Sequence, residues 1–373
     1  MTNGAARNGA DPRRLSTGEP GGVLPSRGLR SALDSGRFVI TAELGPPRGA
    51  DPEAIRRKAA MLRGWVDAAN ITDNQSAHVR LSSFAGSVLA HAEGVEPVMQ
   101  LTCRDRNRIA LQSDLLSAAA LGIPNILLLT GDHPRFGDHP EAKAVFDLDG
   151  VQLVWTARTM RDQGRLLSGR RIDPAPRWLI GTVENPFSPP TSFRARRLAK
   201  KVVAGAEFAQ TQFVFDLGTF ERFMADVRDL GVDGRCGIIA GVGPVRSLRA
   251  LEFMRTKVPG IHIPDDMVRR LRGVAADRVA EEGTRICIEI IQRLTEIRGV
   301  AGAHVMAFGY EQGVPEILER AGVGPRPVAP VPDHPVPDHP VPDHPVPDHP
   351  VPDHPVPDHA KPDHPKEGSG CAG

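Results

Sequence analysis

Two kinds of segment alternate along most of the chain. Eight short runs, rich in β-branched and other apolar residues, have the length and composition of buried strands. Amphipathic stretches with helical spacing separate these runs, and Ile55, Ala59 and Leu62, for example, fall on one helical face. The predicted strands span residues 38–43, 66–71, 97–101, 125–129, 178–183, 209–215, 236–240 and 303–306.

Several helices also have recognisable ends. Asp51 followed by a Pro and a Glu predicts a capped helix start, because the carboxylate accepts from free N–H groups and Pro tolerates the first turn. Residues 108–121 and 191–204 have the same amphipathic pattern. We expect Asp265 to cap a long helical segment over residues 267–298, and Gly283 to interrupt it.

Alternating strands and helices predict an α/β fold, and two observations favour a (β/α)₈ TIM barrel over residues 31–325. The predicted strands number eight, as in a TIM barrel. A doubly wound dinucleotide-binding sheet would favour a G-x-G-x-x-G sequence after the first strand, and none occurs there. Residues 241–243 weakly match a phosphate loop, but a plain strand-to-helix turn explains them better.

The segments outside the barrel have a different composition. Residues 1–30 are rich in Gly, Arg and Pro without periodicity, which predicts a disordered leader. Residues 326–373 contain seven Pro-Asp-His units, which predict a disordered, extended tail. A solvated spacer is the ordinary interpretation, and weak metal binding by histidines such as His334 and His339 is the alternative. We expect no metal site in the barrel.

Composition narrows the class of protein. A net charge of +1 gives no reason to expect nucleic acid or a membrane surface as a partner, and no run of apolar residues is long enough to span a bilayer. The N-terminal residues lack the apolar core of a secretory signal, and the four cysteines are far apart, as is typical of reduced thiols. We expect a cytoplasmic protein that forms a homo-oligomer.

In a TIM barrel the functional side chains lie where the strands end. Glu43 ends the first predicted strand, directly before Leu-Gly-Pro-Pro, and a carboxylate is costly to bury without a purpose. Burial favours the protonated form of a carboxyl group, which suits a general acid, although a salt-bridged structural Glu is the alternative. Asp132 places a second carboxylate after the fourth strand, and Gly131 beside it allows a close backbone approach to a ligand.

The sixth predicted strand and the helix before it carry further polar residues. Gln212 directly precedes the apolar residues Phe-Val-Phe, and a buried glutamine needs a partner, either a protein group or a ligand amide. Lys200 and Lys201 precede this strand, where they would meet a phosphate or simply form a solvated helix end. Because no HExxH, GxSxG or Walker sequence occurs, metalloprotease, serine-hydrolase and P-loop functions lose their main support.

Several of these strand ends, in this order, resemble the methylenetetrahydrofolate reductase family. The resemblance covers about residues 28–323 and is most specific in segments 41–47, 101–107, 129–134, 137–153 and 204–216. It looks closest to the short bacterial reductases and to the reductase half of homocysteine methyltransferase fusions. It implies a barrel that carries FAD and, in one-carbon and methionine metabolism, reduces 5,10-methylenetetrahydrofolate to 5-methyltetrahydrofolate with electrons from NAD(P)H.

The resemblance also implies roles for single residues. Glu43 would be the general acid that helps to open the imidazolidine ring of the folate, and Asp132 would lie near both flavin and pterin. Gln212 would contact folate in one half-reaction and the reductant in the other. The residues similar to FAD-contacting positions of the family are Thr72, Gln100, Gly131, Asp132, Phe146, Asp149 and Lys201.

Three positions depart from the family's pattern. Gln100 stands where a His is common before Leu-Thr-Cys, residues 185–186 read Asn-Pro instead of His-Pro, and residues 310–311 read Tyr-Glu where an Arg is frequent. The alternative function is a barrel subunit of a methyl- or electron-transfer complex that takes electrons from a partner protein rather than from NAD(P)H.

Overall fold

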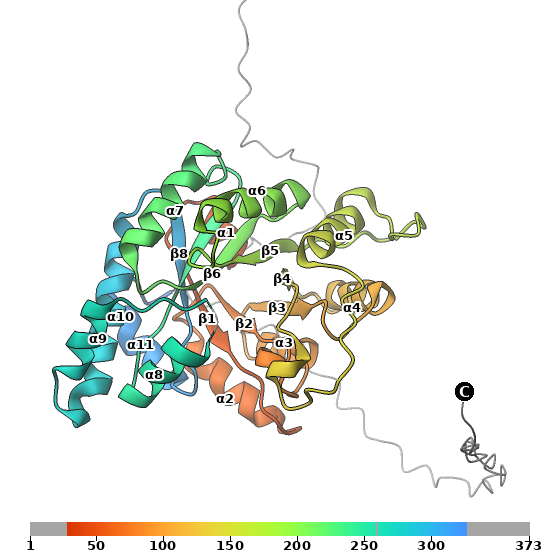
Figure 1. Cartoon of the computed structure of the whole chain (residues 1–373). Helices are drawn as coiled ribbons and strands as arrows, with labels where there is room; N and C mark the ends of the chain where they lie inside the picture. The colour runs from red at the N-terminus through yellow and green to blue at the C-terminus, as the bar shows by residue number, and fades with distance from the viewer. Residues whose placement is uncertain (1–27, 259, 327–373) are drawn as a thin grey trace, which may run out of the picture. The chain divides into compact units, whose positions relative to one another are not determined.

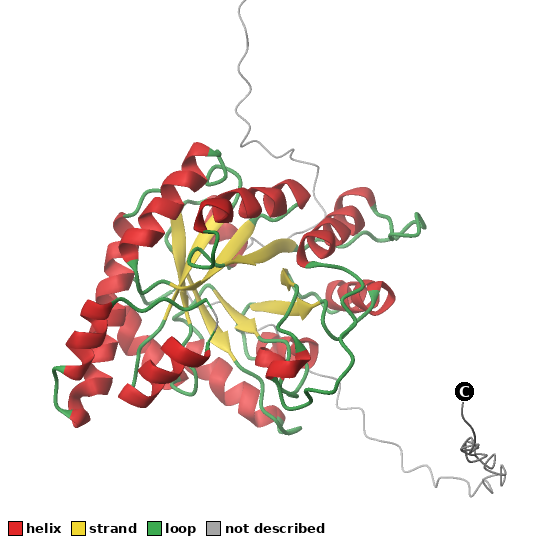
Figure 2. Ribbon diagram, viewed as in Figure 1, coloured by secondary structure: helices red, strands yellow, loops and turns green. Residues whose placement is uncertain are grey.

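The computed structural model describes residues 28–258 and 260–326. Its strands form one closed barrel, in which each strand pairs in parallel with the next and the last pairs with the first. Helices surround the strands (Figures 1 and 2), so the predicted (β/α)₈ barrel is confirmed. The strands are β1 (Val39–Leu44), β2 (Ala68–Ile71), β3 (Pro97–Thr102), β4 (Asn125–Leu129), β5 (Leu179–Glu184), β6 (Phe208–Phe213), β7 (Gly237–Val242) and β8 (Val300–Val305).

All eight predicted strands are present, with ends that differ by a few residues. The largest shift is in β8, which begins at Val300 instead of residue 303. The first residues of β8 include Ala301 and Gly302, whose small side chains weaken the apolar pattern that marks a strand. A Cβ at Gly302 would lie 2.2 Å from the carbonyl oxygen of Val39, so the close packing of β8 against β1 explains the glycine.

Helices follow the strands around the barrel, and two extra ones, α8 and α9, lie between β7 and α10. The Asp51 carboxylate accepts from the N–H of Glu53 at 2.9 Å, as its position before a Pro predicts. The helices are α1 (Leu29–Asp34), α2 (Pro52–Leu62), α3 (Ser83–Ala92), α4 (Arg108–Ala120), α5 (Gly150–Gln163), α6 (Arg194–Ala204), α7 (Leu217–Asp229), α8 (Leu248–Lys257), α9 (Asp265–Arg272), α10 (Val279–Glu296) and α11 (Val314–Ala321).

Two expectations about the segment after α8 are wrong. The helix breaks between α9 and α10, after Gly273, whereas Gly283 lies inside α10. A Cβ at Gly283 would lie 1.9 Å from the carbonyl oxygen of Val245, so this glycine lets α10 approach the chain that follows β7. Asp265 is the first residue of α9 rather than its cap, and the residue before it is Pro264, which offers no side-chain acceptor.

The N-terminal end of the barrel is closed by α1. Leu29 and Ala32 are buried against the first residues of the strands, among them Val39 and Phe208. Glu96 anchors this helix, because its carboxylate accepts from the N–H of Leu29 at 2.9 Å. α1 thus starts before residue 31, where the barrel was expected to begin.

The two flanking segments lie mostly outside the described residues. Residues 1–27 and 327–373, which include His334 and His339, belong to this part of the chain. The leader, the tail and metal binding by the tail therefore stay predictions. Within residues 28–258 and 260–326, no helix has the length and apolar character needed to cross a bilayer.

Candidate active site

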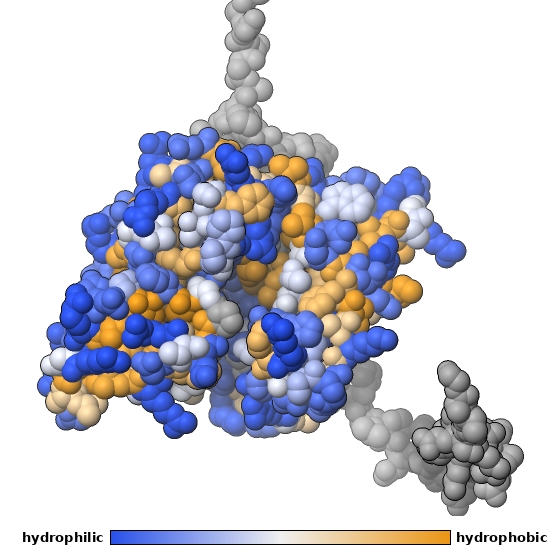
Figure 3. Space-filling model, in the orientation of Figure 1, coloured by the Kyte–Doolittle hydropathy of each residue, from blue (hydrophilic) through white to orange (hydrophobic). Residues whose placement is uncertain are grey.

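A cavity of about 410 Å³ opens where β3, β4 and β5 end. In Figure 3 the viewed face is hollowed near its middle, with both hydrophilic and hydrophobic residues around the hollow. The cavity is polar, because three aspartates and three cationic side chains line it together with exposed backbone: Asp73, Asp132, Asp149, Arg104, Arg197 and Lys201. The C-terminal ends of the strands thus carry the polar cleft that the barrel fold predicts.

The structure gathers about half of the residues singled out from the sequence around this cavity. Five of them line it: Gln100, Gly131, Asp132, Asp149 and Lys201. Four others are not among its lining residues: Glu43, Thr72, Phe146 and Gln212.

Glu43 lies at the end of β1 with 8 % of its surface exposed. Its Oε1 accepts a hydrogen bond from Nε2 of Gln75 at 2.9 Å, and its Oε2 lies 3.9 Å from Nε2 of His304 on β8. Gln75 also lines the cavity, so the carboxyl group stands one residue away from it. Neither Gln75 nor His304 was identified from the sequence.

A chain of hydrogen bonds inside the barrel sets the orientation of His304. Gln210 and Asn70 exchange two amide hydrogen bonds, and Nε2 of Gln210 also donates to Oγ1 of Thr41 at 3.2 Å. The Thr41 hydroxyl and Nδ1 of His304 share a hydrogen bond of 2.9 Å. The other ring nitrogen, Nε2, is thereby directed toward Glu43.

Gln212 has a protein partner in the structure. Its Oε1 accepts from the N–H of Phe213 at 3.0 Å. Gln210, two residues earlier, is the buried glutamine that is paired inside the barrel. The pairing of β6 with β7 shifts register between Gln210 and Phe213, so the regular alternation of side chains is interrupted there.

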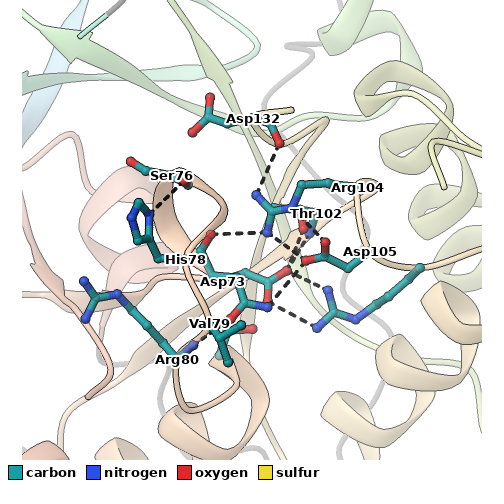
Figure 4. Close-up of polar contacts among 12 residues, drawn as sticks. Asp73, Ser76, His78, Val79, Arg80, Thr102, Arg104, Asp105 and Asp132 are labelled. Carbon is teal, nitrogen blue, oxygen red and sulfur yellow. Dashed lines mark hydrogen bonds and ion pairs between the residues drawn. The ribbon is translucent and has the colours of Figure 1, made fainter. Parts of the chain in front are cut away.

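Asp132 follows β4 with an exposed side chain. Its backbone carbonyl accepts from Nη1 of Arg104 at 3.4 Å, and in Figure 4 its carboxylate points away from that arginine. Gly131 has a φ of +89°, and a Cβ there would lie 3.0 Å from Cβ of Thr102. The positive φ angle and the contact with β3 are enough to explain a glycine at position 131, without a ligand.

Arg104 connects the loops after β2, β3 and β4. It is 2 % exposed, and its guanidinium binds the Asp105 carboxylate through Nε and Nη2 at 2.8 and 2.7 Å. It also donates to the carbonyl oxygen of Asn74 at 3.2 Å (Figure 4). Burial works to lower the pKa of Arg104, but the carboxylates of Asp105, Asp73 and Asp132 raise it, so the cation is retained.

A second buried arginine pair braces the same loops. The Asp73 carboxylate, fully buried, accepts from both Nη atoms of Arg106 at 2.7 and 3.2 Å. It also accepts from the backbone N–H and the hydroxyl of Thr102, both at 2.9 Å. Such bidentate pairs fix geometry as well as charge, so the ends of β2 and β3 hold one arrangement.

The far side of the cavity is a cluster of cations around one buried carboxylate. Oε2 of Glu184, at the end of β5, lies 3.4 Å from Nζ of Lys201, and Oε1 lies 3.9 Å from Arg194 and from Arg197. Lys201 also donates to the carbonyl oxygen of Val183. Burial lowers the pKa of Lys201, and the Glu184 carboxylate opposes that effect. Three cations against one carboxylate leave positive charge that suits an anionic group.

The remaining predicted residues have local contacts of their own. The Asp149 carboxylate caps α5 by accepting from the N–H of Gln152 at 2.7 Å. Phe146 has a φ of 41° and lies beside His133, with ring centroids 6.3 Å apart. Thr72 is 2 % exposed, and its hydroxyl has no partner among the described residues.

A sequence model described as methylenetetrahydrofolate reductase matches residues 28–322. The chain belongs to this family. The resemblance noted in the strand ends is therefore confirmed, and the family's members are oxidoreductases. Across residues 28–258 and 260–326, no group of three or more His, Cys, Asp or Glu side chains is placed to bind a metal.

Named reductases from eukaryotes and bacteria are similar to the chain. A probable NADPH-linked methylenetetrahydrofolate reductase of Caenorhabditis elegans is 28 % identical over 79 % of this chain, and methylenetetrahydrofolate reductase 2 of Saccharomyces cerevisiae is 27 % identical over 66 %. The chain spans only 44 % and 40 % of the length of these two relatives. The 5,10-methylenetetrahydrofolate reductase of Pectobacterium carotovorum is 24 % identical, with 92 % of its length covered.

A solved structure supports the fold. It is a Clostridium thermocellum protein, described as uncharacterized and as binding two copies of 5-methyl-5,6,7,8-tetrahydrofolic acid, with a TM-score of 0.56 at 15 % identity. The match covers 79 % of this chain and 99 % of that one.

The departures from the family's pattern have structural partners here. Asn185 donates to the carbonyl oxygen of Gly260 at 3.0 Å and accepts from the N–H of Phe187 at 3.0 Å. The guanidinium of Arg246 stacks over the Tyr310 ring, with Cζ 3.4 Å from the ring centroid, in a cation–π contact. Both positions therefore stabilise loops around the mouth of the barrel.

Proposed function

We propose that this chain reduces 5,10-methylenetetrahydrofolate to 5-methyltetrahydrofolate in a flavin-dependent reaction. The observation that carries the proposal is Glu43, a nearly buried carboxyl group at the end of β1, directly beside a polar cavity. Family membership and the folate-binding neighbour of the same fold support the choice of substrate. The NADPH-linked and NADH-linked names of relatives support a nicotinamide electron donor.

The residues around the cavity fit FAD. Thr72 precedes Asp73, which lines the cavity, and its buried hydroxyl has no partner among the described residues; such a group is costly unless a ligand binds it. The N-terminus of α5 borders the cavity, and Arg197 and Lys201 face it, which suits a pyrophosphate. FAD, when bound, supplies the hydride transfer. We propose Thr72, Gln100, Gly131, Asp132, Phe146, Asp149 and Lys201 as the residues that hold it.

The proposed catalytic residue is Glu43, which donates a proton to the folate as its imidazolidine ring opens. A positioned acid contributes to the rate only if its proton is free for the substrate. Within the described residues, Oε2 of Glu43 accepts no hydrogen bond, whereas Oε1 is bound by Gln75. Asp132 is proposed to bind the pterin and to lie near the flavin, and Gln212 to contact the folate.

Anaerobic turnover of the purified protein tests the proposal. We expect bound or added FAD to give a flavin absorbance that NADH or NADPH bleaches, and methylenetetrahydrofolate to restore it. Turnover with reduced methyl viologen but with neither nicotinamide would mean that a partner protein supplies the electrons. A preparation that reduces no methylenetetrahydrofolate with any donor, with FAD present, would overturn the proposed function.

A further inference from the structure

We propose that Gln75 is a positioning residue that aims the proton of Glu43 and links this acid to the cavity. The inference rests on the proposed function, because it needs Glu43 as an acid. Gln75 belongs to η1 (Gln75–Ala77), in the loop after β2. It lines the cavity, and its Nε2 lies 2.9 Å from Oε1 of Glu43. The Gln75 side chain thus both binds the Glu43 carboxyl group and lines the neighbouring cavity.

The amide determines which carboxyl oxygen carries the proton. The Nε2 group of a glutamine only donates, so Oε1 of Glu43 must accept and the proton of the acid form must sit on Oε2. Oε2 faces Nε2 of His304 at 3.9 Å. This distance is longer than a hydrogen bond, so His304 does not accept the Glu43 proton. The proton is therefore left for a bound substrate.

The backbone around Gln75 is strained in a way that fixes its direction. Asn74, Ser76 and Ala77 have φ angles of 44°, 55° and 60°, in the left-handed region that side chains disfavour. Strained conformations of this kind persist only where the surroundings hold them, and they gather at functional sites. Without its anchors we expect the loop to relax and the Gln75 amide to turn away from Glu43.

The anchors come from the loops after β3 and β4. Arg104 donates to the carbonyl oxygen of Asn74, and the Asn74 side chain donates to Asp105 at 3.4 Å. The N–H of Val79 donates to the Asp138 carboxylate at 3.1 Å. Arg104 also donates to the carbonyl oxygen of Asp132, as Figure 4 shows. A ligand that contacts Asp132 would therefore contact the same hydrogen-bonded loops that orient Gln75.

Half-reaction kinetics on the full-length, FAD-loaded protein test this role. Gln75→Leu keeps the size of the side chain and removes the amide, while Gln75→Asn keeps the amide one methylene shorter. We expect Gln75→Leu to slow flavin reoxidation by methylenetetrahydrofolate roughly 10- to 100-fold, the range that a misplaced group costs. Flavin reduction by NAD(P)H should stay within about twofold, and Gln75→Asn should recover part of the lost rate.

His78→Gln, in the same loop, is the matched control. His78 is half-buried, and its Nδ1 contacts the Ser76 carbonyl oxygen rather than Glu43, so both half-reactions should keep their rates. Equal slowing of both half-reactions in Gln75→Leu, or an unchanged folate half-reaction, would overturn the positioning role. A wild-type protein that reoxidises no flavin with folate would instead overturn the proposed function, and the role of Gln75 with it.

Discussion

The two ends of the barrel each contain a largely buried glutamate, and the two carboxyl groups have different partners. At the N-terminal end, Glu96 accepts from the N–H of Leu29 and from Nδ2 of Asn125, at 2.9 and 2.7 Å. At the C-terminal end, Glu43 has one hydrogen bond among the described residues, from Gln75, and a second oxygen that is free. The first carboxyl group holds α1 in place, and the second is joined to a cavity through Gln75.

The difference shows where a barrel keeps its chemistry. The N-terminal end packs Leu29 and Ala32 into an apolar cluster, whose burial stabilises the fold. The C-terminal end leaves polar groups such as the Thr72 hydroxyl without protein partners, at a cost in stability. Substitutions at the two ends should therefore separate activity from stability.

The largest expected effect is at the C-terminal end. Glu43→Gln keeps the shape of the side chain and removes the acid, so methylenetetrahydrofolate reduction should fall roughly 100- to 10,000-fold. Flavin reduction should survive, because hydride transfer into FAD needs no proton from this group. Single-turnover measurements of the two half-reactions check this. Equal losses in both would assign Glu43 a structural role.

The next effect is at the N-terminal end. Leu29 has no exposed surface, so Leu29→Ala should lower the free energy of unfolding by about 2–5 kcal/mol, as buried leucine truncations do. Urea unfolding measures the loss. The rate per folded molecule should match wild type, and a changed KM for folate would show that the two ends are coupled.

A smaller, pH-dependent effect involves Glu96. Burial raises the pKa of Glu96 from 4.5 to about 6, against the opposing hydrogen bond from Asn125. A raised pKa means that the folded state binds the proton more tightly, so this contribution is fully present below pH 4.5 and is lost as the pH rises through 6. The loss amounts to up to about 2 kcal/mol.

Unfolding free energies of wild type and Glu96→Gln across pH 4–7 test this sign. The difference between the two proteins should change through that window and then level off. Glu141→Gln, at an exposed loop position, is the control and should follow wild type at every pH. A constant difference between wild type and Glu96→Gln would contradict the assignment.

The smallest expected effect on stability is on the surface helix α11, away from both ends of the barrel. Glu316 and Arg320 form an ion pair of 2.8 Å on α11, but their side chains are 56 % and 45 % exposed. Exposed pairs four residues apart on a helix contribute less than about 0.5 kcal/mol, so Glu316→Gln should barely shift the thermal midpoint. A shift comparable to that of Leu29→Ala would mean that α11 supports the barrel more strongly than its exposure indicates.

Much of the fold could be read from the sequence because strand and helix periodicities are local properties. The eight apolar runs became eight strands, and Asp51 caps α2 as its position before Pro52 predicts. Gly283 misled the prediction because its cause is a contact with Val245, almost 40 residues away in the chain. No local pattern reports such an approach.

The candidate site divides in the same way. The sequence by itself determined that Glu43 and Asp132 end strands, because a carboxylate after an apolar run is visible in one dimension. Only the tertiary structure brought Gln75 and His304 to the two oxygens of Glu43 and Arg104 to three loops. These contacts join segments up to about 260 residues apart, and closure of the barrel, with β8 beside β1, is the physical reason that they exist.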